Sequence, residues 1–204
     1  MPELGLFPLE LVLLPSERVP LHIFEDRYKE LIGDCMSDDC EFGLILEDGD
    51  GLRQVGTRTA VLELVDRFDD GRMNVLVEGR ERFRVVELTE GRSFQTAEVE
   101  PHEDDEDAGE GPEAEQALEV FRRLLAVAEA DQVEEPSVSV PHLSFHLAAR
   151  VDFGHELKQE LLELRSERER LTRLADLLER ATEALNRERE VRDRASGNGK
   201  VTRS

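Results

Sequence analysis

Tryptophan is absent from this 204-residue chain, and tyrosine, cysteine and lysine are scarce. The two cysteines are Cys35 and Cys40, and neither belongs to a C-x-x-C pair of the kind that binds zinc or carries out redox chemistry. We therefore expect both thiols to be reduced. A disulfide between them is the weaker alternative, because the helix expected around Cys35 would have to end in time to bring the two sulfur atoms together.

Long hydrophobic runs are also missing. No run approaches the ~20 residues that span a bilayer, and the first residues lack the basic region and apolar core of a signal peptide. The phosphate-binding pattern G-x-x-x-x-G-K-[ST] does not occur. A chain of this length holds one domain with a helical extension, or two small domains. We expect a cytoplasmic protein that makes no contact with a membrane.

Acidic residues dominate the charge, with 48 acidic against 26 basic residues and a formal net charge of −22. Such an excess repels nucleic-acid phosphates, so we expect no nucleic-acid partner. Arg80, Arg82 and Arg84 alternate along an expected strand and therefore share one face. We interpret that face as solvated, with Phe83 and Val85 turned to the core, rather than as an RNA-binding patch.

Candidate chemistry is sparse. His142 and His146 lie four residues apart on an expected helix, a spacing that lets two imidazoles share a zinc ion. A third ligand would have to come from His155, Glu156 or the acidic loop, so we favour structural or surface histidines. Ser144 lacks the glycine-flanked turn of a nucleophilic serine. We therefore expect no catalytic residue, no cofactor and no metal site, and a protein without enzymatic activity.

The pattern of elements predicts an α+β protein. Short alternating segments separated by turn signals fill residues 1–100 and predict a compact, strongly bent antiparallel sheet or partly closed barrel. Residues 101–113 are almost entirely acidic, Gly and Pro, as in a linker or loop. Helical periodicity fills residues 114–191, and residues 192–204 are expected to be a disordered tail.

Three helices are expected, over residues 112–130, 141–154 and from 155 to beyond 185. The third carries a leucine at every seventh position, namely Leu157, Leu164, Leu171, Leu178 and Leu185. The alternate seam positions of a zipper are poorly filled, by Arg168, Ala175 and Thr182. We therefore expect the first half of this helix to pack on its own helical bundle. The chain is then a monomer, or a weak homodimer through the distal half.

A block near the start combines apolar runs, prolines and aromatic residues but carries no reactive group. It consists of Phe7-Pro8-Leu9, Leu11-Val12-Leu13-Leu14-Pro15, Pro20-Leu21-His22-Ile23-Phe24-Glu25, Arg27-Tyr28 and Cys35. Later pieces include Phe42-Gly43-Leu44-Ile45-Leu46, Val55-Gly56-Thr57, Val77-Glu78-Gly79, Arg82-Phe83-Arg84-Val85 and Leu143-Ser144-Phe145. In order and spacing these pieces resemble, over roughly residues 4 to 180, the amino-terminal substrate-binding domain of the Lon family of ATP-dependent proteases.

The resemblance implies a PUA-like β subdomain and a non-catalytic module that binds unfolded or tagged polypeptide segments, as an adaptor or a holdase. A Lon-type protease is then a natural partner. The resemblance also gives His22 a structural role, a hydrogen bond to backbone where a strand meets a helix. The alternative is a scaffold or assembly protein that works through the long leucine-striped helix. We expect the polypeptide to bind at the early block, with the candidate residues Leu21, Ile23, Phe24, Arg27 and Tyr28.

Overall fold

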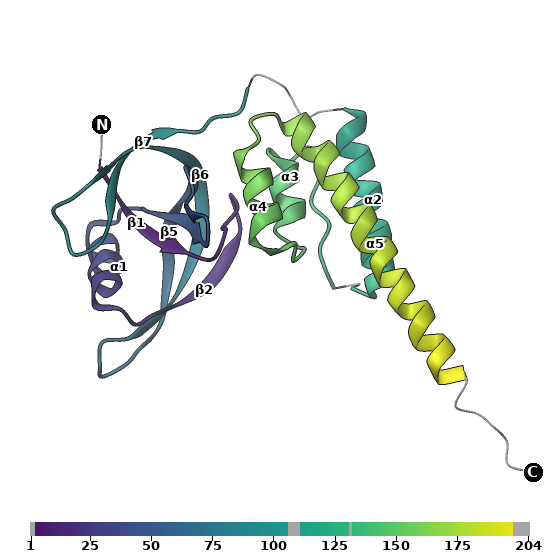
Figure 1. The fold of residues 1–204 in the computed structure, drawn as a ribbon, viewed down its shortest axis with the longest axis horizontal. Coiled ribbons are helices and arrows are strands. Elements are labelled where there is room, and N and C mark those ends of the chain that lie inside the picture. Colours follow the sequence, from purple (N-terminus) through teal and green to yellow (C-terminus); the bar gives the residue numbers. More distant parts are fainter. Residues whose placement is uncertain (1–2, 106–110, 131, 198–204) are drawn as a thin grey trace, which may run out of the picture.

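The computed structural model describes residues 3–105, 111–130 and 132–197, with side chains described to residue 192. Figure 1 shows two lobes, and the C-terminal part of a long helix extends away from both. The β lobe holds β1 (Glu3–Leu9), β2 (Arg18–Ile23), α1 (Asp26–Asp38), β3 (Phe42–Asp48), β4 (Gly51–Leu52), β5 (Val55–Arg67), β6 (Met73–Thr89) and β7 (Thr96–Pro101). The helical lobe holds α2 (Pro112–Ala128), α3 (Leu143–Ala148), α4 (Gly154–Glu163) and α5 (Glu167–Gly197).

The strands of the β lobe form one strongly bent sheet with the order β1-β7-β6-β5-β3-β4. The long strand β6 pairs with β5 on one side and with β2 and β7 on the other. β1 runs antiparallel to β7 and parallel to β3, with Phe7 opposite Leu44. The predicted α+β architecture with a bent sheet is therefore confirmed, but the sheet is mixed rather than purely antiparallel, because β1 and β3 run in the same direction.

Two glycines allow the sheet to bend tightly around the buried ring of Phe83. A Cβ atom on Gly43 would lie 2.8 Å from this ring, and one on Gly56 would lie 2.7 Å from it. Both distances are shorter than any ordinary carbon contact, so only residues without a side chain fit beside the ring. The glycines of the pieces around residues 43 and 56 thus serve the packing of the sheet.

Helix α1 covers one opening of the bent sheet (Figure 1). Its apolar positions recur with helical spacing, and Tyr28, Leu31, Ile32 and Cys35 are all buried. The ring of Phe7 from β1 packs against Tyr28 with 4.0 Å between centroids. Each such buried side chain contributes about 1.5–3 kcal/mol relative to exposure, so this face fixes α1 on the sheet.

One apolar cluster joins the two lobes. It is built mainly from α2, α3, α4 and α5, but Val12, Leu14, Leu46 and Val55 of the β lobe belong to it. Leu171 and Leu178 of the leucine repeat are buried in this cluster, together with Leu174 between them. The prediction that the first half of the stripe packs on its own bundle is therefore confirmed. Ala175, one of the poorly filled seam positions, is buried in this cluster as well.

The predicted single long helix is wrong, because it is broken into α4 and α5. Leu164 is extended, with φ −64° and ψ 134°, and α5 begins at Glu167. The Ser166 hydroxyl accepts a hydrogen bond from the backbone N–H of Glu169 at 3.1 Å, which caps the new helix. The free carbonyl of Leu164 accepts hydrogen bonds from two arginines instead of continuing the helix.

Two other expected boundaries also shift. The second helix is predicted over 141–154, but α3 spans only Leu143–Ala148, because His142 adopts the left-handed conformation at its start. The final helix runs to Gly197, past the predicted start of the disordered tail at 192, and residues 198–204 lie outside the described part of the chain. Of the expected loop 101–113, residues 106–110 also lie outside it. No described helix is both long and apolar enough to cross a membrane.

Candidate functional site

The five predicted binding residues divide between the core and the surface. Leu21, Ile23 and Tyr28 are buried, at 8%, 1% and 5% exposure. Phe24 is 59% exposed, and Arg27 is exposed beside it. The alternation of β2 explains the division, because Leu21 and Ile23 share the inner face of the strand and leave His22 on the outer face. A ligand can reach only Phe24 and Arg27 of the five.

Phe24 belongs to an exposed group that we call the aromatic patch, consisting of His22, Phe24 and Phe68. The His22 ring lies 6.1 Å from the ring of Phe24 and 6.1 Å from that of Phe68, measured between centroids. Phe68 is 40% exposed and comes from the turn between β5 and β6, far from Phe24 in the sequence. No pattern in the sequence indicates that these two rings meet.

His22 does not hydrogen-bond the backbone as predicted. Its Nδ1 lies 2.7 Å from Oδ1 of Asn74, across the β2–β6 ladder where the two residues are paired. The Asn74 amide in turn donates to Asp66 on β5 at 3.3 Å. The side chain is turned outward by the strand alternation, so its nearest partners are other outward side chains. The hydrogen bonds from His22 through Asn74 to Asp66 hold the imidazole between the two phenylalanine rings.

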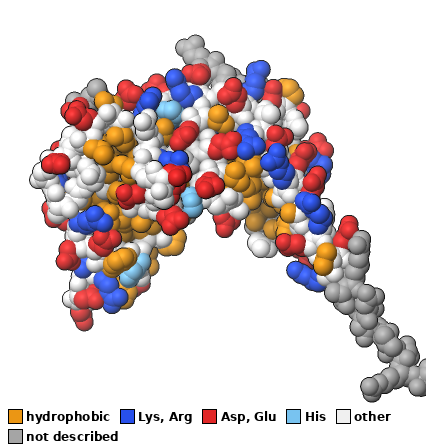
Figure 2. Space-filling view, viewed as in Figure 1, with side chains coloured by type: hydrophobic (Ala, Val, Ile, Leu, Met, Phe, Trp, Pro, Cys, Tyr) orange, Lys and Arg blue, Asp and Glu red, His pale blue; other side chains and the backbone are white. Residues whose placement is uncertain are grey.

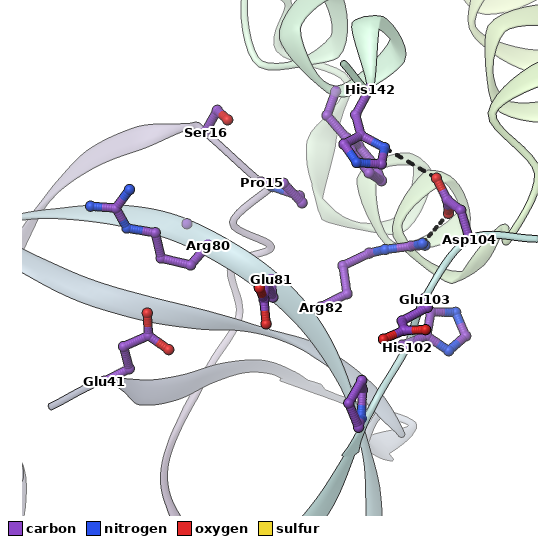
Figure 3. A pocket seen from close by; sticks show the side chains of 13 residues that line it. Pro15, Ser16, Glu41, Arg80, Glu81, Arg82, His102, Glu103, Asp104 and His142 are labelled. Carbon is purple, nitrogen blue, oxygen red and sulfur yellow. Dashed lines mark hydrogen bonds and ion pairs between the residues drawn. The ribbon is translucent and has the colours of Figure 1, made fainter. Parts of the chain in front are cut away.

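A pocket of about 610 Å³ lies between the two lobes (Figure 3). Its floor includes Phe145 of α3, and its walls come from the 15–16 turn, β6 and the segment after β7. Figure 2 shows the surface hollowed between the lobes, with hydrophobic side chains gathered on both flanks of the hollow. We call this the interlobe pocket, lined by Pro15, Ser16, Glu41, Gly79, Arg80, Glu81, Arg82, Pro101, His102, Glu103, Asp104, His142 and Phe145.

A buried ion cluster of Arg82, Asp104, Glu167 and Arg170 lies beside the interlobe pocket, and two of its members, Arg82 and Asp104, line that pocket. Arg82 from β6 and Arg170 from α5 both bind the carboxylate of Asp104. Arg170 also pairs with Glu167 at 2.7 Å, and its side chain is fully buried. Both guanidinium groups face the ring of Phe145, at 5.3 and 4.5 Å from its centroid. The cluster therefore joins the sheet, the segment after it and two helices.

Arg82 is a clear correction to the sequence analysis, which placed it on a solvated face with Arg80 and Arg84. Its side chain is buried and donates to the carbonyl oxygens of Leu162 and Leu164, both at 2.7 Å. The helical lobe covers this one position of the face, while Arg80 and Arg84 stay exposed. Burial lowers the pKa of Arg82 to about 10, which still leaves it charged at neutral pH.

Asp104 is the centre of the cluster. Burial alone would raise the pKa of its carboxyl, but hydrogen bonds from His142 and Arg170 and the charges of both arginines outweigh burial. These contacts hold the pKa of Asp104 well below its usual range. The carboxylate therefore stays ionised at any physiological pH, and its partners stay bound to it.

Three potential metal ligands meet at this ion cluster, but they do not form a cation site. Ligand atoms of Asp104, His142 and Glu167 lie within 4.8 Å of one another, the only such group in the described part of the chain. The guanidinium groups of Arg82 and Arg170 already neutralise both carboxylates at that point. A metal ion would have to displace two buried cations, so the geometry fits an ion cluster better than a metal site.

The other candidate residues behave as structural groups. Ser144 is buried and donates from its hydroxyl to Glu167 at 2.6 Å, while Glu167 also caps the backbone N–H of Ser144. No imidazole contacts this hydroxyl, since its partners are a carboxylate and Arg170. His146 is partly buried, which lowers its pKa, and it lies outside the group of three ligands.

Comparisons with known proteins add an independent observation. A family model described as the ATP-dependent protease La (LON) substrate-binding domain matches residues 3–180. Lon protease of Azospirillum brasilense is 26% identical over 219 residues, which cover 95% of this chain and 26% of that protein. Lon protease 2 of Myxococcus xanthus is 30% identical over 192 residues, covering 85% of this chain and 23% of that protein. The chain thus spans about a quarter of the length of the curated relatives it matches.

Solved structures give the same result. A Lon N-terminal domain protein from Xanthomonas campestris matches with a TM-score of 0.64 and 28% identity, covering 85% of this chain and 97% of that one. The N-terminal domain of the Mycobacterium avium complex Lon protease matches with a TM-score of 0.66 and 17% identity, covering 89% and 98%. The second likeness concerns the fold alone.

Proposed function

This chain belongs to the family of ATP-dependent protease La (LON) substrate-binding domains, and from this membership we propose that it binds unfolded polypeptide segments through its aromatic patch. The family membership gives the class of function, recognition of protein substrates. The placement on Phe24, Phe68 and the adjoining Arg27 rests on the exposure of these side chains. The proposed role is binding alone, without a chemical step by this chain.

The exposure of Phe24 and Phe68 is the observation that carries this proposal. Of the nine phenylalanines in the chain, these two are the exposed ones, and they lie on either side of one histidine. Two isolated exposed rings need no explanation, but rings gathered in one patch are typical of a binding surface. An unfolded segment presents apolar side chains in any order, so a patch dominated by two aromatic rings suits a ligand of varied sequence.

Charged side chains surround the aromatic patch but do not cover it. Arg72 lies over the Phe68 ring with its guanidinium carbon 5.3 Å from the centroid and pairs with Asp70. Arg27 pairs with Glu25 at 2.9 Å. These exposed pairs contribute little to stability, roughly 0–1 kcal/mol each, so a bound segment can displace them at small cost.

The finer role follows from the same binding. A module that holds unfolded segments would act as a holdase by itself, or as an adaptor where a Lon-type protease receives the segment. A scaffold built on the leucine stripe is the weaker alternative, because Leu171, Leu174 and Leu178 are already buried within the chain. We therefore expect a monomer.

A binding experiment with matched variants tests the proposal. The probe is reduced and carboxymethylated α-lactalbumin, an unfolded acidic protein that the net charge of −22 repels. The double variant Phe24→Ser and Phe68→Ser should weaken binding roughly thirtyfold, because each half-exposed ring contributes about 1 kcal/mol. The control Leu88→Ser and Val138→Ser removes two apolar side chains of similar exposure elsewhere. Equal binding by the patch variant and the control would overturn the placement.

A further inference from the structure

A second hollow in the β lobe lies apart from the aromatic patch. This groove, of about 450 Å³, runs between β5 and the end of α1, and we call it the β5 groove. One side is the strand segment 60–64, and the other comes from the end of α1 and the two residues that follow Asp39. Its lining residues are Cys35, Met36, Asp39, Cys40, Glu41, Ala60, Val61, Leu62, Glu63, Leu64 and Arg80.

The strand that lines this groove has an open edge. β5 is paired with β3 only over Thr57–Thr59, and in the described part of the chain no strand pairs with that side of β5 from Ala60 onward. The pairing register between β5 and β6 shifts between Val61 and Glu63. Leu62 is therefore a bulge residue without a partner on β6, and it is 39% exposed. Met36 faces the same groove from α1, at 42% exposure. An open edge beside two exposed apolar side chains is the arrangement that receives an extended peptide.

The charge of the groove selects the kind of peptide. Helix α1 ends at Asp38 with no basic residue in its last turn, so the negative end of its dipole is not compensated. Asp39 and Glu63 line the groove, and neither has an ion-pair partner among the described residues. Arg80 is the one cation in the lining, and Glu78 binds it at 2.7 Å. The field in the groove therefore favours a basic segment.

The β5 groove continues into the interlobe pocket. Glu41 and Arg80 line both hollows, and Figure 3 shows them on the side of the pocket away from His142 and Asp104. Beyond them the pocket presents Glu81 and Glu103, which also have no ion-pair partner in the described residues. Where the hollows meet, Glu41 pairs with Arg58 at 3.9 Å and Arg80 pairs with Glu78, so acidic side chains without an ion-pair partner in the described residues lie on both sides of this junction.

We propose that the β5 groove and the interlobe pocket form one track for an extended polypeptide in which basic and apolar residues alternate. Apolar side chains rest on Met36 and Leu62, basic side chains reach Asp39, Glu63 and Glu81, and the open edge of β5 hydrogen-bonds the backbone. This inference rests on the proposed polypeptide binding and assigns to it a second surface and a preferred segment.

Synthetic peptides test the track directly. The probes are labelled twelve-residue peptides of alternating valine and arginine, or alternating valine and glutamate, with affinity read by fluorescence anisotropy. The valine–arginine peptide should bind at least tenfold more tightly, and its affinity should fall as salt rises. Amide hydrogen exchange of residues 60–64 should slow when it binds. Equal affinity for the two peptides, or unchanged exchange of these amides, would overturn the track.

Variants separate the track from a general attraction to an acidic protein. Glu63→Lys with Glu81→Lys should weaken the valine–arginine peptide at least fivefold more than the control Glu119→Lys with Glu183→Lys, which makes the same change of net charge on the helical lobe. Met36→Asp with Leu62→Asp should lose at least tenfold although it adds negative charge. If the charge variant and its control weaken binding equally, the peptide binds through net charge alone and the track is wrong.

The two proposals fail in different ways. Loss of α-lactalbumin binding in the Phe24 and Phe68 variant, with no effect of any track variant on the valine–arginine peptide, would retain the aromatic patch and refute the track. A wild-type protein that binds neither probe would refute both.

Discussion

Arg170 forms a bidentate ion pair with Asp104, in which one guanidinium nitrogen binds each carboxylate oxygen. Nη1 donates to Oδ1 at 2.6 Å and Nη2 donates to Oδ2, while Arg82 binds Oδ1 from the other lobe. The Arg170 side chain has no exposed surface, and that of Asp104 is 13% exposed. A single carboxylate thus holds a strand of the β lobe and the last helix of the chain together.

Replacing this carboxylate by an amide should cost much of the stability of the junction. Asp104→Asn leaves two buried guanidinium groups facing a neutral side chain, and breaking a buried pair in this way costs about 3–5 kcal/mol. Urea unfolding followed by circular dichroism measures the loss. Asp105→Asn is the matched control, because Asp105 pairs with Arg165 on the surface and should cost less than about 1 kcal/mol. Equal losses in the two variants would show that the cluster does not hold the lobes together.

The same carboxylate predicts an acid-sensitive contribution to stability. The pKa of Asp104 is lower in the folded chain than the value of about 3.9 expected when unfolded, so folding favours its ionised form. The stabilisation is therefore fully present above about pH 5 and is lost progressively as the pH falls through 4 and below. Measured between pH 7 and pH 3, the free energy of unfolding should fall more steeply for the wild type than for Asp104→Asn. Parallel curves would contradict the assignment to Asp104.

Periodic features of this chain could be predicted because they depend on neighbours in sequence. Heptad spacing identifies Leu171 and Leu178 as part of an apolar stripe, and both are buried. The alternation of side chains along β2 could also have predicted which of the binding candidates are buried, since it places Ile23 on the face opposite to His22. The prediction treated the early block as one surface and ignored this alternation. It therefore included core residues among the binding residues.

The ion cluster and the aromatic patch could not be predicted, because each depends on residues far apart in sequence. Asp104 lies 22 residues from Arg82 and 66 from Arg170, and within an acidic segment it has the pattern of a solvated charge. No sequence pattern around Phe68 indicates that its ring contacts His22. The helix break is different, because the serine and glutamate at 166 and 169 have the spacing of a capping box. The leucine repeat continues through residues 164–166, so the periodicity predicts a continuous helix there and outweighs the capping signal.

The two thiols should differ sharply in reactivity. Burial, together with a hydrogen bond that the Cys35 thiol donates to Cys40, raises the pKa of Cys35 far above its ordinary value, so its thiolate is scarce at neutral pH. Cys40 is exposed. In the folded protein, a maleimide reagent should therefore modify one thiol quickly, and peptide mass spectrometry should place it at Cys40. Cys35 should react only in denaturant, and Cys40→Ser should abolish the fast phase. Fast modification of Cys35 in the folded protein would contradict its burial.

The cap at the start of α5 gives a prediction about the break between the two last helices. The Ser166 hydroxyl accepts the hydrogen bond of the Glu169 N–H, so Ser166→Ala leaves that donor without its side-chain partner. The loss should be about 1 kcal/mol, seen as a lower urea midpoint with an unchanged slope. Ser166→Asp should restore most of it, since aspartate also caps helices and its charge suits the positive end of the helix dipole. If helices α4 and α5 were instead continuous in solution, Ser166→Ala would stabilise the protein, because alanine has the higher helix propensity within a helix.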